Sequence, residues 1–570
     1  MKLSRRDLLR YSLSTAGTIY VSTALGGCTL QRAAASLSPV NFDSGVASGD
    51  PSADSIMLWT RAAGAQDGAT VKVGWELALD PGFSKALRSG VASSDAARDY
   101  TIKVDVRELT PGTDYYYRFL GAGGASEVGR TRTLPVGELS ELRMAVFSCA
   151  NFPAGYFHAY GEASRLPAVD VFLHLGDYFY EYGDGGYATQ RATELGRELA
   201  ADNDGELYTL TDYRRRYALY RSDRDLQAMH AAAPMIAVWD DHEIANDTWR
   251  EGAQNHSSDE GDFDTRKAAA VQAYFEWLPL RPVSADSSGR IYRSFDFGDL
   301  VSLHMLDTRL VGRDQQLEYG DFVDSQSRAM DADGFAEAMR DPARSLLGEA
   351  QREWLYDAMA ESPARWQVLG QQVLMARMHM PAEVLRELFA EPDFAKRDYS
   401  RFTLLMTELA GLKNTLSAGE VLSESQQERL QAVLPYNLDA WDGYPAERAL
   451  LYAAARRLDK PLIVLAGDTH NAWYSELQDG EGRRVGVELG VHGVSSPGME
   501  SYLQLDEVHA QQLAGALTIL IDELRYCQLS QRGYLEVLFR RDEVTARWHF
   551  FDSVTRRDYA TSAHSETFSL

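Results

Sequence analysis

The chain has 570 residues, of which 45% are hydrophobic and 25% are charged, a composition that is ordinary for a soluble globular protein. This length is too great for one small core, so we expect at least two domains. The formal net charge of −26 argues against nucleic acid as a partner, because no basic face is evident that would neutralise phosphates.

The first 28 residues are typical of an export signal. Arg5 and Arg6 precede a weakly apolar stretch, residues 11–24, which matches a twin-arginine signal and is too short and polar to span a membrane. The run LGGC ending at Cys28 is similar to a lipoprotein cleavage site; an ordinary cleaved signal with an incidental cysteine is the alternative. We therefore expect the twin-arginine export machinery as a partner. The mature protein would lie in the cell envelope, the periplasm or at the extracellular surface, held to the membrane only by a lipid on Cys28.

The next segments predict a small β domain. Residues 29–40 are small and polar and are expected to form a linker. The segment that follows alternates as strands, and Pro111-Gly112 feeds an aromatic-rich strand at residues 115–119. A Pro-Gly turn before such a strand is typical of a β-sandwich and resembles fibronectin type III domains. We place this domain at residues 41–135.

Strands and helices alternate from residue 140 onward, which predicts a second domain at residues 140–555 and a C-terminal tail at residues 556–570. Strands are expected at 142–147, 169–175, 235–239, 366–374, 462–466 and 485–489, hairpins at 290–306 and 534–551, and helices at 156–166, 211–226, 264–278, 348–359 and 450–458. Residues 313–344 and 377–434 are expected to be irregular or helical insertions.

Four predicted strands end in side chains that can bind a metal. Singly, each end is weak evidence, because a strand-end aspartate is often a helix cap and a lone histidine or tyrosine is often structural. Four such ends in one α/β domain favour a metal site, since ligands bind beyond the carboxyl ends of strands. The side chains are Cys149; Asp177 with Tyr180; Asp240, Asp241 and His242, with Asn246 one turn later; and Asp468 with His470.

The mixture of ligand types indicates the chemistry. Tyrosine phenolate and cysteine thiolate suit trivalent iron, whereas aspartate and asparagine oxygens suit hard divalent ions such as calcium. A carboxylate such as Asp177 can bridge two ions, and two ions about 3.5–4 Å apart can hold a hydroxide for in-line attack on phosphorus. His242, beside Asp241, is placed to contact the phosphate or to protonate the leaving group.

Six motifs resemble the alkaline phosphatase D (PhoD-like) family: SCAN, GDYFYEYG, WDDHEIANDTW, LDTR, DAWDGYPAER and GDTHNAW. The similarity extends from residue 42 to about residue 551. The family belongs to the calcineurin-like metallophosphoesterase superfamily. The resemblance implies an α+β fold, in which an N-terminal fibronectin-III-like β-sandwich is followed by an αββα four-layer metallophosphatase domain. It also implies one iron ion (Fe³⁺) bound by Cys149, Asp177, Tyr180 and His470, one or two calcium ions (Ca²⁺) bound by Asp241, Asn246 and Asp468, a bridging role for Asp177, and a substrate-facing His242.

The chain departs from the family pattern at two positions. Where the family commonly has two consecutive asparagines, this chain has Asn246-Asp247. The superfamily's further histidine ligand has no clear equivalent, because Gln371-Gln372 ends the predicted strand there. The ligand set of the second metal therefore stays open. Asp307 and Arg309 would either shape the pocket rim or form an internal salt bridge.

We expect an exported, metal-dependent alkaline phosphatase that acts on small-molecule phosphate esters, with possible phosphodiesterase activity. The close alternative is a phosphodiesterase or phospholipase D-like enzyme acting on phospholipid head groups. A surface calcium-binding lipoprotein without catalysis is the alternative from another class. Structural calcium sites use oxygen rather than thiolate ligands, so the pairing of Cys149 with Tyr180 favours the enzyme.

Overall fold

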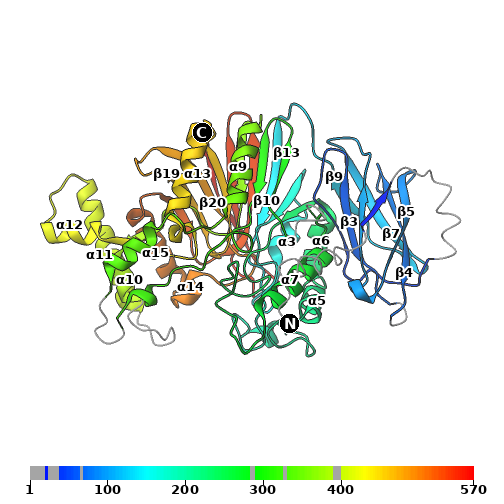
Figure 1. The fold of residues 1–570 in the computed structure, drawn as a ribbon, viewed down its shortest axis with the longest axis horizontal. Coiled ribbons are helices and arrows are strands. Elements are labelled where there is room, and N and C mark those ends of the chain that lie inside the picture. The colour runs from blue at the N-terminus through cyan, green and yellow to red at the C-terminus, as the bar shows by residue number, and fades with distance from the viewer. Residues whose placement is uncertain (1–18, 23–36, 65–67, 283–288, 325–329, 389–398) are drawn as a thin grey trace.

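The structure is a computed structural model that describes residues 19–22, 37–64, 68–282, 289–324, 330–388 and 399–570. The twin-arginine motif and Cys28 lie outside these residues. Figure 1 shows a β domain at one end of the molecule and a larger body built on two sheets with helices on both sides. The fold is α+β, as the sequence predicts.

The N-terminal domain is a β-sandwich. The Tyr115 hydroxyl accepts a hydrogen bond from the Thr110 backbone N–H at 2.8 Å. This tyrosine corner is a hallmark of immunoglobulin-like sandwiches and follows from the Pro-Gly turn in the sequence. One sheet contains β2 (Val46–Gly49), β3 (Ile56–Arg61) and β6 (Thr101–Val106), and the other contains β4 (Val71–Ala78), β5 (Ala86–Ser94), β7 (Asp114–Gly121), β8 (Gly124–Ala125) and β9 (Gly129–Arg132).

Two short described stretches before the sandwich pair with it. Strand β1 (Ile19–Ser22), within the predicted signal segment, pairs in parallel with β6. In the predicted linker, the Ser38 backbone N–H donates to the Lys72 carbonyl at 2.9 Å. Both contacts have one physical reason: a strand edge offers unpaired backbone groups, which an extended neighbouring segment satisfies.

The sandwich is joined to the second domain through the backbone. Strand β2 pairs in parallel with β12 at Gly49 and Met235, so one sheet of ten strands runs through both domains. A Cβ atom at Gly49 would lie 2.6 Å from the Met235 carbonyl oxygen, so no other residue fits there without a shift. In order, the sheet is β1-β6-β3-β2-β12-β11-β10-β22-β23-β24, with β10 at Glu141–Phe147, β11 at Val171–His174, β12 at Met235–Ala237, β22 at Arg532–Arg540, β23 at Val544–Phe551 and β24 at Thr561–Phe568.

A second sheet of seven strands packs against the first. Its central strands are buried on both faces, as parallel strands covered by helices are. In β18, Ile463 and Leu465 join the core between the sheets, whereas Leu462 and Val464 join the core beneath the outer helices. The order is β13 (Arg293–Phe297), β14 (Val301–Met305), β15 (Trp366–Gly370), β18 (Leu462–Ala466), β20 (Arg484–Gly490), β19 (Ala472–Gln478) and β21 (Leu524–Gln528).

Helices complete the αββα layers (Figure 1). The predicted helix at 211–226 is two helices, because Asp223 caps the second one by accepting from the backbone N–H groups of Asp225 and Leu226. The first sheet is covered by α3 (His158–Ala163), α5 (Leu210–Tyr220), α6 (Arg224–Ala232) and α7 (Phe263–Trp277), and the second by α9 (Glu349–Glu361), α13 (Pro445–Arg457) and α15 (Glu507–Leu520). The remaining elements are α4 (Ala192–Leu195), α8 (Ala332–Arg340), α10 (Ala382–Leu388), α11 (Tyr399–Ser417), α12 (Glu424–Gln431), α14 (Met499–Tyr502), β16 (His379–Pro381), β17 (Val433–Pro435), η2 (Ala96–Arg98), η3 (Tyr319–Phe322) and η5 (Trp441–Gly443).

The predicted C-terminal tail, residues 556–570, is wrong in part. Strand β24 lies within it and pairs antiparallel with all eight residues of β23. Its small and polar residues lack the hydrophobic pattern that predicts a strand. The strand is held instead by its backbone hydrogen bonds to β23 and by the burial of Phe568. The Phe568 ring is only 8% exposed and stacks on Tyr474, with ring centroids 6.1 Å apart.

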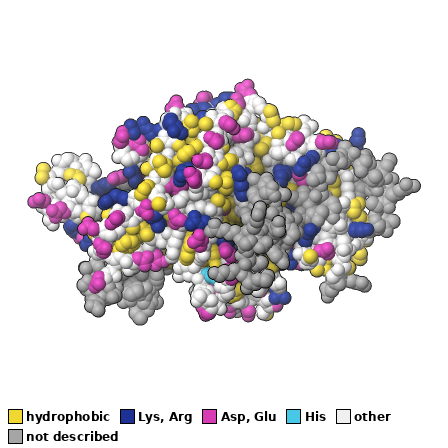
Figure 2. All heavy atoms as spheres, in the orientation of Figure 1, with side chains coloured by type: hydrophobic (Ala, Val, Ile, Leu, Met, Phe, Trp, Pro, Cys, Tyr) yellow, Lys and Arg dark blue, Asp and Glu magenta, His cyan; other side chains and the backbone are white. Residues whose placement is uncertain are grey.

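Acidic and basic side chains are interspersed on the face of the molecule that Figure 2 shows. Among the helices that the structure describes, none combines the length and the apolar composition that a membrane crossing requires.

We expect Phe568→Ala to destabilise the protein by about 3 kcal/mol, because it removes a buried aromatic ring from the core. The thermal unfolding midpoint, followed by circular dichroism, measures the effect. Ser565→Ala is the matched control, since Ser565 lies on the same strand and is exposed. Equal midpoints for the two variants would contradict a structural role for β24.

Candidate metal centre

The carboxyl ends of strands from both sheets meet at one place. Cys149 follows β10 by two residues, Asp177 follows β11 by three, and Asp468 follows β18 by two. Because β10, β11 and β12 are parallel neighbours, their loops emerge at the same sheet edge. The loops after β11 and β12 approach so closely that position 176 requires glycine. A Cβ atom on Gly176 would lie 2.4 Å from the Asp240 Cβ.

The backbone is strained at four of the predicted ligands. Cys149, Asp177, Asp468 and His470 have φ angles of 59°, 53°, 66° and 62°, in the left-handed region that favours glycine. Each costs on the order of 1 kcal/mol or more and persists only where the surroundings hold it, which is a common property of functional sites. Here the Cys149 N–H donates to the Gly176 carbonyl at 3.2 Å, so two of the strand-end loops hold each other.

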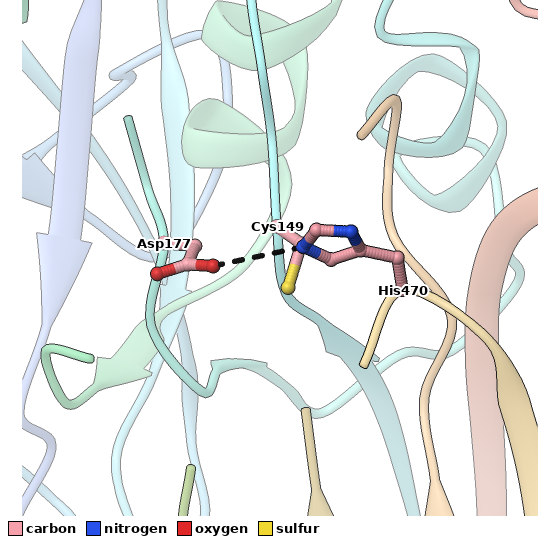
Figure 3. Close-up of side chains that lie close together, drawn as sticks. All are labelled: Cys149, Asp177 and His470. Carbon is pink, nitrogen blue, oxygen red and sulfur yellow. Dashed lines mark ion pairs between the residues drawn. The ribbon is translucent and has the colours of Figure 1, made fainter. Parts of the chain in front are cut away.

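The residues predicted to bind iron come together (Figure 3). Ligand atoms of Cys149, Asp177 and His470 all lie within 4.8 Å of one another. The Tyr180 hydroxyl donates to Asp177 Oδ2 at 3.0 Å and lies 3.0 Å from His470 Nε2. His470 Nδ1 donates to the Pro497 carbonyl at 2.7 Å, which leaves Nε2 as the ligand atom.

Burial keeps the donor groups of this cluster neutral when no metal ion is bound. Burial raises the pKa of the Cys149 thiol well above its usual range, and the Asp177 carboxylate raises it further. Burial and Asp177 likewise raise the pKa of Tyr180, and burial lowers the pKa of His470 to about 3. Thiolate and phenolate are therefore favoured only when a bound metal ion compensates their charge.

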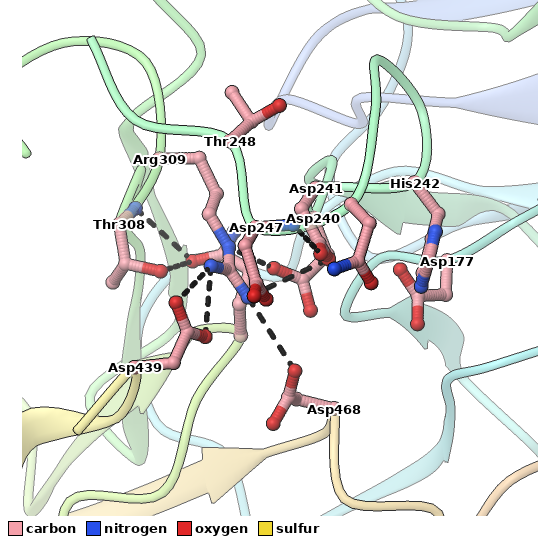
Figure 4. Close-up of polar contacts among 12 residues, drawn as sticks. Asp177, Asp240, Asp241, His242, Asp247, Thr248, Thr308, Arg309, Asp439 and Asp468 are labelled. Carbon is pink, nitrogen blue, oxygen red and sulfur yellow. Dashed lines mark hydrogen bonds and ion pairs between the residues drawn. The ribbon is translucent and has the colours of Figure 1, made fainter. Parts of the chain in front are cut away.

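A second cluster adjoins the first and shares Asp177 with it. Asp177, Asp241 and His242 form one close group, and Asp240, Asp241 and Asp468 form another (Figure 4). Asp177 Oδ1 is buried without a hydrogen-bond donor, and Asp241 Oδ1 has only the Arg309 guanidinium at 3.5 Å. Buried carboxylate oxygens without a partner are costly, so this donor set fits a metal ion. Asp177 is placed as a bridge between the two clusters.

The second cluster opens into a cavity of about 190 Å³. Asn246 lines this cavity and its side-chain amide donates to Gln254 at 3.1 Å. The Asp247 backbone N–H donates to Asp241 Oδ2 at 2.6 Å, and burial raises the pKa of the Asp247 carboxyl to about 7. All the predicted site residues of the second cluster, together with His242 and His470, therefore reach one pocket.

Arg309 lies inside the site rather than at its rim. Its guanidinium is fully buried and contacts Asp240, Asp439 and Asp468 at 2.5, 2.9 and 3.4 Å (Figure 4). Asp307 is also buried and accepts the Arg309 backbone N–H at 2.9 Å. The internal salt bridge is therefore correct for Arg309, although its partners are other aspartates; Asp307 accepts backbone N–H groups and is not one of these partners. Without this cation, the gathered carboxylates would repel one another.

Sequence reasoning missed two buried glutamates. The Glu243 carboxylate accepts backbone N–H groups from Asp177 at 3.1 Å and Asp240 at 2.8 Å, so it ties the ends of β11 and β12 together. Burial raises the pKa of Glu243 to about 8. Glu181 lies 2.7 Å from His242 Nδ1 and accepts the Asn246 N–H at 2.8 Å. Both lie within motifs that the sequence analysis singled out, but a motif does not show which carboxylates point into the site.

Gln372, at the end of the strand where the sequence offers no clear equivalent of the superfamily's further histidine, is fully hydrogen-bonded. Its Oε1 accepts from the Thr308 N–H at 3.1 Å and hydroxyl at 2.6 Å. Its Nε2 donates to the carbonyls of Trp239 and Leu306 at 2.7 and 3.0 Å. Each polar atom of this carboxamide therefore has protein partners, and its role is to join three segments of the second domain.

The fold and the strand-end cluster define a phosphoric ester hydrolase of the metallophosphatase type. The sequence model of the PhoD-like phosphatase matches residues 144–548, and that of the PhoD-like phosphatase N-terminal domain matches residues 27–135. The chain belongs to the PhoD-like phosphatase family. This confirms the family, the fold class and the type of enzyme that the sequence predicts.

Relatives support this membership. The chain is 34% identical over 459 residues to alkaline phosphatase D of Bacillus subtilis (strain 168), which covers 78% of this chain and 67% of that protein. A solved structure of PhoD superposes with a TM-score of 0.72 and 29% identity, covering 93% of this chain and 90% of that one.

We expect Glu181→Gln to lower the pKa of His242. Burial disfavours the imidazolium, but the carboxylates of Asp241, Glu181 and Asp177 together raise the His242 pKa well above its usual range. Removing one of these charges should move the imidazole titration about 1 pH unit lower, as measured by NMR in protein freed of metal. Glu206→Gln is the control, since Glu206 pairs with an arginine instead. An unchanged His242 titration in Glu181→Gln would contradict this electrostatic coupling.

Proposed function

We propose that this protein is an exported, metal-dependent phosphoesterase that hydrolyses organic phosphate esters at a two-metal site. The observation that carries the proposal is the position of Asp177, which belongs to both clusters of ligand atoms. One side of Asp177 has sulfur, phenol and imidazole donors, and the other side has carboxylates. Two-metal phosphatases need a shared carboxylate of this kind between two unlike ions.

We assign the metals by donor type. Cys149, Asp177, Tyr180 and His470 would hold Fe³⁺, because thiolate and phenolate are anionic donors that suit a trivalent ion. Asp241, Asn246 and Asp468, with the shared Asp177, would hold one or two Ca²⁺ ions, which prefer oxygen ligands.

When bound, the metal ions supply Lewis-acid activation of water and of the phosphate group. His242 lines the cavity, and Glu181 holds its Nδ1, so His242 is the proton donor for the leaving oxygen. Neither lysine nor arginine is among the described side chains that line this cavity, so positive charge toward the substrate comes from the metals. Tyr436 and Tyr502 line the same cavity and would contact the organic part of the ester.

The export signal and the lipid anchor are part of this proposal. The twin-arginine motif would direct the protein to the export machinery, and Cys28 would carry the lipid. Both motifs lie outside the described residues. Cleavage before Cys28 would also remove β1, which would leave β6 as the edge of the ten-stranded sheet.

Asp177→Asn should reduce hydrolysis by about 1000-fold or more while the protein stays folded, because the bridging charge is lost. Rates on a phosphate monoester and a phosphate diester, measured side by side, test the proposal and show which ester is preferred. Asp184→Asn is the control, since Asp184 lies in the same loop and is exposed. Full activity of Asp177→Asn would remove this residue from the bridge.

Protein loaded in its native host should contain iron and absorb visible light through tyrosinate-to-iron charge transfer. Tyr180→Phe should remove the absorption band, whereas Tyr182→Phe in the same loop should keep it. Elemental analysis with visible spectroscopy measures both. Wild-type protein with calcium but neither iron nor the band would favour a calcium-binding protein without catalysis.

A further inference from the structure

A second cavity, of about 550 Å³, lies against helix α13, on the side of the second sheet away from the first. It shares no lining residue with the catalytic cavity. Four arginines and two carboxylates line it, and two further buried carboxylates, Asp442 and Glu523, pair with two of the arginines. The arginines are Arg377, Arg448, Arg456 and Arg483, and the carboxylates are Asp479 and Glu481.

Arg448 is the central feature of this cavity. Its side chain is 5% exposed, and Nη1 donates to Asp442 at 2.7 Å and to the Met375 carbonyl at 3.0 Å. Its Nε and Nη2 atoms have no hydrogen-bond partner, yet they are not among the side-chain atoms sealed from solvent. A nearly buried guanidinium therefore presents one edge to a carboxylate of the protein and its other edge to the cavity.

The other arginines are held in the same manner. Arg377 pairs with Glu523, and Arg456 and Arg483 both pair with Asp479, at distances of 2.6–2.8 Å. Each keeps at least one terminal nitrogen without a partner. The protein's carboxylates thus orient the guanidinium groups without using all of their donors, as in sites that bind oxyanions with several oxygens.

We propose that this cavity is a binding site for a phosphoryl oxyanion, separate from the catalytic centre. The ligand is either free inorganic phosphate or the phosphate group of a small monoester. Several arginines with free N–H donors line this cavity, and they match a tetrahedral dianion, which can accept hydrogen bonds on three or four oxygens. The proposal rests on this cavity alone and does not depend on the assignment of the metals.

Phosphate binding by the full chain tests the proposal. In an Asp177→Asn background, which disables the catalytic site, calorimetry should detect one equivalent of inorganic phosphate. Arg448→Lys keeps the charge opposite Asp442 but lacks the second edge of the guanidinium, so binding should weaken about tenfold or more. Arg457→Gln is the matched control, since Arg457 is exposed on the same helix and does not line the cavity.

If Arg448→Lys does not fold, a double variant still tests the proposal. Arg456→Gln combined with Arg483→Gln replaces the two more exposed arginines and should also weaken phosphate binding about tenfold. Glycerol phosphate, which the Asp177→Asn background leaves intact, shows whether a monoester binds as tightly as free phosphate. No phosphate binding at millimolar concentration, equal binding by all variants, or binding of citrate but not phosphate would each overturn the proposal.

Discussion

The constraint on which this structure depends is the burial of several carboxylates at one meeting point of two sheets. Burial raises the pKa of Asp177 and Asp468, and in Asp240 it does so to about 6 despite the contact with Arg309. One buried arginine is not enough to neutralise this group. The carboxylates are therefore fully charged only when protons are replaced by further cations, which agrees with the candidate metal-binding groups found here.

Buried side chains join the loops around these carboxylates and hold them in place. Glu243 joins the loops after β11 and β12, Gln372 joins segments across the second domain, and Arg309 joins loops from both sheets. Left-handed backbone at Cys149 and Asp177 is tolerated because these contacts hold it. The ten-stranded sheet extends this scaffold into the β-sandwich, so the N-terminal domain is continuous with the sheet that carries half of the site.

Much of the fold was predictable, and the failures have identifiable reasons. Strong apolar runs such as residues 462–466 gave the correct strand bounds, since buried parallel strands are continuously hydrophobic. Strand β24 was missed because its side chains are mostly exposed and its pairing with β23 is a backbone property. The helix at 211–226 was not divided, because local capping by Asp223 competes with a continuous helical pattern. Helix α15 was also missed.

By itself, the sequence determined which chemical groups are present and that each follows a strand. That was enough to predict the family and the enzyme class, and to name the candidate ligands, but not the buried glutamates Glu181 and Glu243 beside them. Only the tertiary structure decided which atoms meet: Tyr180 and His470, 3.0 Å apart, are separated by 290 positions in the chain. It also decided that Arg309 is an interior cation and that Gln372 is not free to bind a metal. These contacts depend on how the two sheets pack, and a short sequence motif does not show which distant residues it will contact.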